Sequence, residues 1–289
     1  MTFLRDGGED YDRELKEEIN RKYEGRSTEI DQTEHQRRIG FTARIVALTL
    51  ALIFLFTVTG RWLAVFAGPA MYFLRESWAL SDEPLVQDLR QAVVQIQVER
   101  PIGSPQSSSR GTGFNIASEG LIITNRHIVE DAANVRVSFA ERGSYSAQSW
   151  HESSHVDLAL IELQSRDLPF VDLANEPPEP EEELLVIGNP LQFTRVANRG
   201  ILEGYRPNPT REIPYLVIEA MIYPGSSGSP LFTKEGEVVG VVFATLRNRD
   251  PAEVRGVAVS AEEVIQFLQE SNYLRMLYDW QERINEVDD

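Results

Sequence analysis

The stretch Leu121-Ile-Ile-Thr-Asn-Arg-His-Ile-Val129 shows the pattern that repeats through the body of this chain. It begins with a short apolar, β-branched run typical of a buried strand, and polar residues end that run. Comparable runs continue on both sides, without helical patterns between them, at residues 92–98, 121–124, 134–139, 158–163, 183–187, 215–219, 237–243 and 256–260. This succession predicts an all-β barrel or sandwich.

The segments between and after these runs predict how the region is divided. A proline- and glutamate-rich loop at 177–183 separates halves of about 89–176 and 184–260. After the second half, residues 261–270 have helical apolar spacing, and Ser260 stands where an N-cap is expected. We therefore expect a C-terminal helix after the last strand.

Two further segments are polar. Residues 103–113 are rich in glycine and serine, which predicts a flexible loop. Residues 273–289 follow the expected folded domain, 89–272, as an amphipathic and acidic tail. Neither segment is assigned a function from its composition.

A long apolar segment precedes the β-rich region. Residues 45–60 carry no charge, and apolar character resumes after Arg61. A spanning helix needs about 20 mostly apolar residues, so a transmembrane helix is predicted at 45–66. It would follow a polar segment, 1–44, and precede a linker, 67–88. The alternatives are a buried core helix and a cleaved signal peptide, for which the 44-residue leader is long.

Flanking basic residues predict the orientation of this span. Arg37, Arg38 and Arg44 precede it closely, whereas the only basic residues near its other end are Arg61, within the span close to that interface, and Arg75. Because basic residues are enriched on the cytoplasmic side, the N-terminus is expected in the cytoplasm. The remaining chain would then be periplasmic or extracellular, held to the inner membrane by one pass through the lipid bilayer.

Composition excludes several functional classes. The balance of 28 Lys+Arg against 45 Asp+Glu gives a net charge of −17, which argues against a nucleic-acid partner. The sequence has no cysteine, so it has no disulfide framework, thiolate metal site or cysteine nucleophile. Nothing in the sequence calls for a cofactor or a metal.

Three polar positions fit acyl-transfer chemistry. His127 follows one apolar strand, Asp157 begins another, and residues 224–231 form a tight turn of small residues with serines. A serine hydroxyl is a weak nucleophile unless an imidazole takes its proton, and an aspartate can orient and stabilise that imidazole. Glycine beside the serine lets backbone N–H groups face a developing oxyanion.

The series of motifs that contains these positions resembles the chymotrypsin-fold serine proteases, most closely the HtrA/Deg group. The matching motifs are Gly-Thr-Gly-Phe, Thr-Asn-x-His-Ile-Val, Asp-Leu-Ala-Leu-Ile, Ile-Gly-Asn-Pro and Pro-Gly-x-Ser-Gly-x-Pro-Leu, at 111–114, 124–129, 157–161, 187–190 and 224–231. The resemblance implies two six-stranded antiparallel β-barrels. It also implies extended or unfolded polypeptide substrates and, because members are often trimers, a homotrimer. Because the sequence ends soon after the barrels, PDZ-mediated regulation, which many members have, is not expected here.

By this resemblance, His127 is the general base, Asp157 orients it and Ser227 is the nucleophile. The backbone N–H groups of Gly225 and Ser227 would form the oxyanion hole. The predicted function is that of a membrane-anchored serine endopeptidase that forms an acyl-enzyme, in extracytoplasmic quality control or regulated proteolysis.

The same register places Met221 at the base of the primary specificity pocket, near Ile222 and Phe243. These side chains offer no acidic group, which predicts small or medium apolar P1 residues. The strand 239–245 is expected to accept an extended substrate by β-pairing.

Two alternatives accompany this interpretation. His151-Glu-Ser-Ser-His155 matches the zinc-protease signature His-Glu-x-x-His, which requires a helix, but the strand that follows at once favours a solvated β-hairpin tip. The other alternative is a protease-like binding module or chaperone with a disabled site.

Overall fold

The computed structural model describes residues 16, 48–50, 54, 69–104, 107–190, 193–247, 254–271 and 273. The chain divides into two units, Met1–Gly68 and Pro69–Asp289, and almost all described residues belong to the second. The expected polar segment, membrane span and C-terminal tail lie almost entirely outside the described residues. Among the residues that are described, none forms a helix with the length and apolar character needed to cross a bilayer.

Two helices occupy most of the segment expected to be a linker. Helix α2 spans Pro69–Leu80, and α3 spans Pro84–Ala92 with its proline in the first turn, where a missing N–H costs nothing. In α3, Val86 and Leu89 are buried at helical spacing against the core. Gln87 donates its backbone N–H to the Glu83 carbonyl at 3.1 Å, so α3 begins directly after a tight connection from α2.

The first half of the β-rich region forms a seven-stranded antiparallel sheet in the order β5-β4-β1-β2-β3-β7-β6. Its elements are β1 (Val93–Glu99), β2 (Ser108–Asn115), β3 (Leu121–Thr124), α4 (Arg126–Val129), β4 (Asn134–Ser138), β5 (Ser144–Ser146), β6 (Ser149–Glu152) and β7 (Ala159–Glu162). The expectation of a closed six-stranded barrel here is wrong. The two edge strands are short: β5, of three residues, pairs only with β4, and β6, of four residues, pairs only with β7. The strand order therefore does not close.

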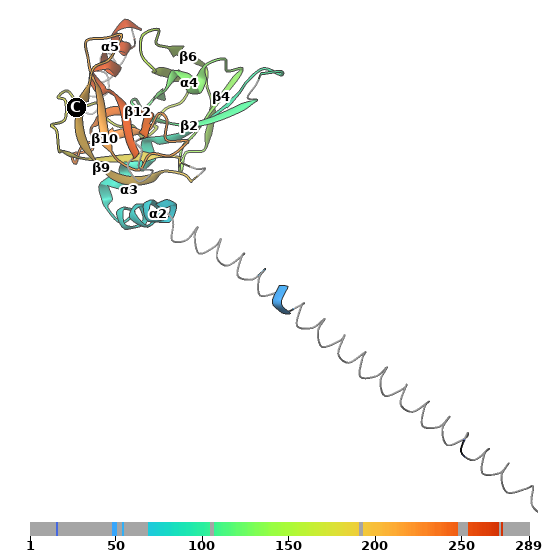
Figure 1. Cartoon of the computed structure of the whole chain (residues 1–289). Coiled ribbons are helices and arrows are strands. Elements are labelled where there is room, and N and C mark those ends of the chain that lie inside the picture. Colours follow the sequence, from blue (N-terminus) through green and yellow to red (C-terminus); the bar gives the residue numbers. More distant parts are fainter. Residues whose placement is uncertain are drawn as a thin grey trace, which may run out of the picture. The chain divides into compact units, whose positions relative to one another are not determined.

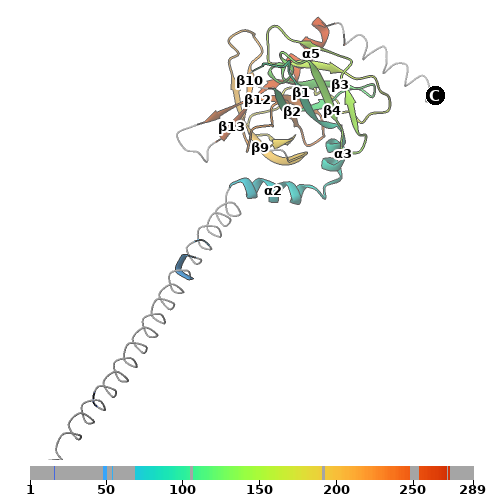
Figure 2. The same ribbon diagram turned by 90° about the vertical axis from the view of Figure 1, so that its right-hand side faces the viewer.

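The second half is a closed six-stranded barrel in the order β10-β13-β12-β11-β8-β9, as expected. Its strands are β8 (Glu183–Gly188), β9 (Val196–Arg206), β10 (Tyr215–Glu219), β11 (Pro230–Phe232), β12 (Val238–Arg247) and β13 (Val254–Ser260). The predicted C-terminal helix is confirmed as α5 (Ala261–Glu270), capped by the Ser260 hydroxyl, which accepts the Glu263 N–H at 3.4 Å. Helix α5 lies at the opposite end of the two sheets from α2 and α3 (Figures 1 and 2).

Strand β2 corrects the prediction of a flexible loop at 103–113, because its second half is buried between β1 and β3. Its glycines permit this position: a Cβ on Gly111 would lie 2.8 Å from Ile128, and one on Gly113 would lie 2.8 Å from Ile96 and Ile122. A glycine-rich run reads as flexible when its neighbours are unknown, yet here close packing requires glycine.

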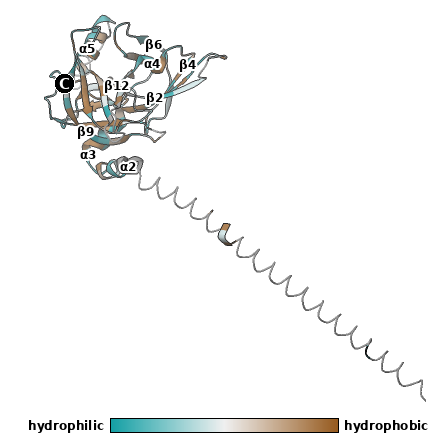
Figure 3. Cartoon of the chain, viewed as in Figure 1, coloured by the Kyte–Doolittle hydropathy of each residue, from teal (hydrophilic) through white to brown (hydrophobic). Residues whose placement is uncertain are grey.

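Hydrophobic residues are frequent along the strands of the sheet and of the barrel (Figure 3). One buried cluster includes Phe114 of β2, Ile187 of β8 and Phe232 of β11, and therefore joins the sheet to the barrel. Two further clusters fill the sheet and the barrel separately. The proposed site residues lie where the two halves meet.

Candidate active site

His127 and Asp157 are held together by two hydrogen bonds. His127 lies in α4, the short helix after β3, and Asp157 lies two residues before β7, the neighbour of β3. The distance from His127 Nδ1 to Asp157 Oδ2 is 2.6 Å, and the His127 backbone N–H donates to Asp157 Oδ1 at 3.0 Å. Since a carboxylate only accepts, Nδ1 carries the proton in this pair, and Nε2 is left as the basic nitrogen.

The residues before His127 also hold the aspartate in place. The Asn125 side-chain amide donates to the Asp157 backbone carbonyl at 2.9 Å. Arg126 donates to the carbonyl of Ser153 at 3.1 Å, so its guanidinium braces the loop that carries Asp157. This contact gives Arg126 a structural role beside His127.

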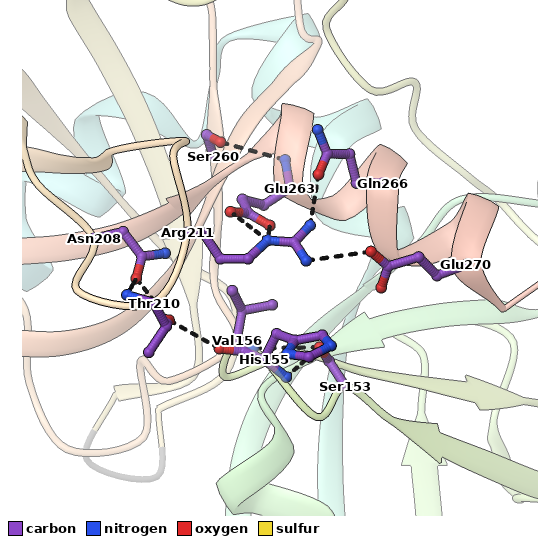
Figure 4. Close-up of polar contacts among 10 residues, drawn as sticks. All are labelled: Ser153, His155, Val156, Asn208, Thr210, Arg211, Ser260, Glu263, Gln266 and Glu270. Carbon is purple, nitrogen blue, oxygen red and sulfur yellow. Dashed lines mark hydrogen bonds and ion pairs between the residues drawn. The ribbon is translucent and has the colours of Figure 1, made fainter.

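The loop from Ser153 to Asp157 has its own internal support (Figure 4). The Ser153 hydroxyl accepts the backbone N–H groups of His155 and Val156, each at 3.3 Å. From the connection between β9 and β10, the Thr210 hydroxyl lies 3.3 Å from the His155 carbonyl. The position of Asp157 therefore depends on both halves of the molecule.

The turn with the candidate nucleophile needs glycine at two positions. Gly225 and Gly228 have φ values of +99° and +83°, which L side chains rarely adopt. A Cβ on Gly228 would lie 1.9 Å from the Thr112 carbonyl oxygen, and one on Gly225 would lie 2.5 Å from the Asn189 carbonyl oxygen. The turn thus packs backbone to backbone against β2 and against the end of β8.

Thr112 of β2 connects the turn to the sheet. Its backbone N–H donates to the Ser227 carbonyl at 2.9 Å, and its hydroxyl donates to the Gly225 carbonyl at 2.8 Å. The same hydroxyl accepts the Asn189 N–H at 2.9 Å. The Thr112 carbonyl accepts the hydroxyl of Thr124, three residues before His127, at 2.7 Å. A short chain of hydrogen bonds therefore links the Ser227 turn to the strand that leads to His127.

The structure brings His127 and Asp157 together and places the Ser227 turn at the same junction. Among the described residues, no hydrogen bond joins Ser227 to His127, so the proton transfer between them stays a prediction. Within the same residues, the backbone N–H groups of Gly225 and Ser227 have no acceptor. Two unused donors on one turn are what an oxyanion hole requires.

The expected pocket residues have different environments. Ile222 is buried and packs in the barrel core, where a Cβ on Gly256 would lie 2.9 Å from it. Phe243 is half-buried, and its ring lies 5.0 Å from that of Tyr215. The sulfur of the half-buried Met221 accepts a hydrogen bond from the Tyr223 hydroxyl at 3.7 Å. Their role as a specificity pocket is a proposal.

Sequence reasoning missed Thr112 and Asn189 as functional supports. Both lie within motifs that carried the resemblance, Gly-Thr-Gly-Phe and Ile-Gly-Asn-Pro, which was the available signal. Spacing alone could not reveal that one threonine hydroxyl serves a turn more than a hundred residues later.

The zinc-protease signature does not have the geometry that it needs. His151 lies on strand β6 and His155 lies in the turn to β7, so the two do not share a face of a helix. His151 Nε2 contacts Glu162 at 3.2 Å. In the described parts of the chain, no three histidine, cysteine or acidic residues are grouped to hold a metal ion.

Residues 111–241 match the family described as "Trypsin-like peptidase domain". This part of the chain is similar to trypsin-like peptidase domains. The match covers the central part of the two sheets and includes all three residues of the proposed triad. The resemblance to trypsin-like serine proteases that the motifs indicated is confirmed.

The peptidase domain has relatives among the DegP-like proteins. A "Probable periplasmic serine endoprotease DegP-like" of Pseudomonas putida (strain GB-1) is 33% identical over 164 residues, which are 55% of this chain and 34% of the relative. The protein of the same name from Marinomonas sp. (strain MWYL1) is 34% identical over 146 residues, which are 50% of this chain and 31% of the relative. The chain thus spans about a third of the length of these curated relatives.

A solved structure supports the fold. The active form of the Rv3671c protease from M. tuberculosis superposes with a TM-score of 0.58 and 28% identity, over 66% of this chain and 85% of that chain. The comparisons confirm the HtrA/Deg resemblance of the peptidase domain.

Proposed function

We propose that this chain is a serine endopeptidase whose nucleophile is Ser227, with His127 as general base and Asp157 as the residue that orients it. The observation that carries the proposal is the paired contact of Asp157 with the Nδ1 and backbone N–H of His127. It fixes the ring so that Nε2 is the basic nitrogen, in a domain that matches trypsin-like peptidases.

The proposed reaction proceeds through an acyl-enzyme. His127 Nε2 takes the Ser227 hydroxyl proton as the oxygen attacks the peptide carbonyl, and Asp157 stabilises the resulting imidazolium. The N–H groups of Gly225 and Ser227 would stabilise the tetrahedral oxyanion, each contributing about 3–4 kcal/mol to transition-state stabilisation. The imidazolium then protonates the leaving amine, and water releases the acyl group by the same route.

The substrates and setting are proposed from the sequence and the relatives. Met221, Ile222 and Phe243 carry no charge, which favours small or medium apolar P1 residues in extended or unfolded polypeptides. The relatives' names describe periplasmic serine endoproteases. An extracytoplasmic protease domain anchored at 45–66 in the inner membrane, and assembled as a homotrimer, fits protein quality control or regulated cleavage.

Covalent labelling tests the chemistry directly. A fluorophosphonate probe should label the wild-type chain and the Ser226→Ala and Ser229→Ala variants, but not Ser227→Ala. Label on a Ser227→Ala chain would assign the nucleophile to another residue. A folded wild-type chain that takes no label would favour the binding module or chaperone with a disabled site. Light scattering of the purified chain would test the trimer.

A further inference from the structure

Helix α2 holds the edge of strand β9 where its barrel neighbour ends. Strand β10 pairs with β9 only from Arg206 back to Ile201, opposite Glu219. Beyond this point, two side chains of α2 take the place of the missing strand. The Ser77 hydroxyl accepts the backbone N–H of Ala197 at 3.0 Å, and Glu76 Oε1 accepts that of Arg199 at 3.0 Å.

These contacts belong to a fixed part of the helix. Ser77 is 6% exposed, and Leu80, one turn later, is 4% exposed and packs in the cluster between the two halves. Arg90 of α3 donates to both the hydroxyl and the carbonyl of Ser77, at 3.0 and 3.1 Å. The backbone N–H of the buried Ala197 needs an acceptor, which Ser77 supplies, whereas the Glu76 contact to Arg199 lies at the surface, so α2 is a structural part of the barrel edge.

Between these two positions and after them, Asn198 and Gly200 of β9 contact the segment that follows β10. The Asn198 side-chain amide donates to the Met221 carbonyl at 3.4 Å, and Asn198 is only 5% exposed. A Cβ on Gly200 would lie 2.7 Å from that of Ala220, so β9 approaches the 220–221 segment as closely as glycine allows. Successive residues of β9 therefore alternate between contacts with α2 and contacts with the segment around Met221.

We infer that Glu76 and Ser77 of α2 are positioning residues for the specificity pocket. They hold the backbone of β9 at Ala197 and Arg199 and thereby fix the position from which Asn198 donates to the Met221 carbonyl. The position of Met221 at the base of the proposed pocket then depends on α2. The inference rests on the proposed function because it uses Met221 as a pocket residue. It gives α2, the first helix of the protease unit, a role in substrate choice without contact with substrate.

The experiment compares P1 selectivity in full-length variants. Glu76→Met removes the acceptor at nearly constant size, Glu76→Gln keeps an acceptor oxygen, and Ser77→Ala removes the hydroxyl. Values of kcat/KM for peptides with alanine, valine or phenylalanine at P1 are normalised to the fraction of chain that fluorophosphonate labels. This normalisation removes any loss of folded protein, which would lower all substrates equally.

We expect Glu76→Met and Ser77→Ala to change the ratio between P1 residues about 5-fold or more, because a loosened wall discriminates poorly between side chains of different size. Glu76→Gln should keep the wild-type ratio. Hydrogen exchange provides a readout that needs no catalysis. Protection of the backbone N–H should fall about 10-fold at Ala197 in Ser77→Ala and at Arg199 in Glu76→Met. In both variants it should also fall at residues 220–223.

Unchanged selectivity together with unchanged exchange at 220–223 would overturn the inference, even if exchange rises at β9. A change in Glu76→Gln equal to that in Glu76→Met would also overturn it, since the acceptor would then be irrelevant. If the wild-type chain takes no label, the proposed function fails instead, while exchange at 220–223 still decides whether α2 positions this segment.

Discussion

Replacing Arg211 with methionine should destabilise the fold by about 3–5 kcal/mol at pH 8, because it leaves a buried carboxylate without its partner. The Glu263 side chain on α5 is 1% exposed, and Arg211 Nε lies 3.2 Å from its Oε2. The guanidinium also donates to Gln266 at 2.5 Å and to Glu270 at 3.2 Å (Figure 4). Glu270 is 51% exposed, so its ion pair adds at most about 1 kcal/mol, and Glu263 dominates the cost.

The pH dependence of this cost follows from the pKa of Glu263. Burial raises the pKa of this carboxyl above its ordinary value, and Arg211 partly offsets the rise. A raised folded-state pKa contributes stability that is present below the unfolded pKa and is lost as pH rises through the folded pKa. Removing Arg211 raises the folded-state pKa of Glu263 further. The variant therefore continues to lose stability up to a higher pH than the wild type does. The deficit of Arg211→Met should therefore shrink on acidification, by at most about 1.4 kcal/mol per pH unit.

Urea unfolding followed by far-UV circular dichroism, at intervals from pH 4.5 to 8, measures this deficit. The control is the double variant Arg211→Met with Glu263→Gln, in which nothing buried is left to ionise. The difference in unfolding free energy between this double variant and the single variant Glu263→Gln should not vary with pH across this range. A deficit below about 1 kcal/mol at pH 8, or one that stays constant down to pH 4.5, would refute this account of the pair.

The remaining predictions concern the proposed site. Asp157→Asn should lower kcat about 10⁴-fold with little loss of stability, because the amide favours the wrong tautomer of His127. Steady-state kinetics with a peptide substrate measure this effect, and a much smaller loss would mean that Asp157 only braces the loop. Gly228→Ala should abolish fluorophosphonate labelling, because its Cβ would lie 1.9 Å from the Thr112 carbonyl oxygen, and full labelling would contradict the turn geometry. Thr112→Val should destabilise the fold by about 1–3 kcal/mol in urea unfolding and slow fluorophosphonate labelling, since it leaves the Gly225 carbonyl without its donor. Thr112→Ser keeps the hydroxyl and should behave as wild type in both measurements.

Sequence periodicity predicted the strands that carry apolar runs of their own, because such residues are buried whatever their partners are. The apolar runs 121–124 and 215–219 coincide with β3 and β10, and the Ser260 cap correctly begins α5. Strand β9 was missed because its residues alternate poorly: Asn198 is buried to contact Met221, and Gly200 is required by close approach to Ala220. Such residues are chosen by partners distant in sequence, which periodicity does not register.

The same distinction applies to the first half and to α2. The number of strands in a barrel is a property of pairing, and the short strands β5 and β6 carry no apolar run of their own. In α2, Glu76 and Ser77 look like ordinary polar helix residues until β9 supplies the N–H groups that they accept. The proposed triad was assigned through the resemblance, because the spacing of the residues does not by itself select the nucleophile.

The junction between sheet and barrel explains why the motif residues around the proposed triad are small and polar. His127 and Asp157 come from the sheet and Ser227 comes from the barrel, so the site depends on how the two halves are held against each other. Thr112 satisfies two carbonyl groups of the Ser227 turn, and its own carbonyl is both bonded by Thr124 and in close contact with Gly228. A larger residue at the glycine or an apolar one at the threonine would separate the halves or leave buried carbonyls unpaired. The turn that carries Ser227 therefore depends on contact between both folded halves, which couples the proposed activity to the integrity of the whole unit Pro69–Asp289.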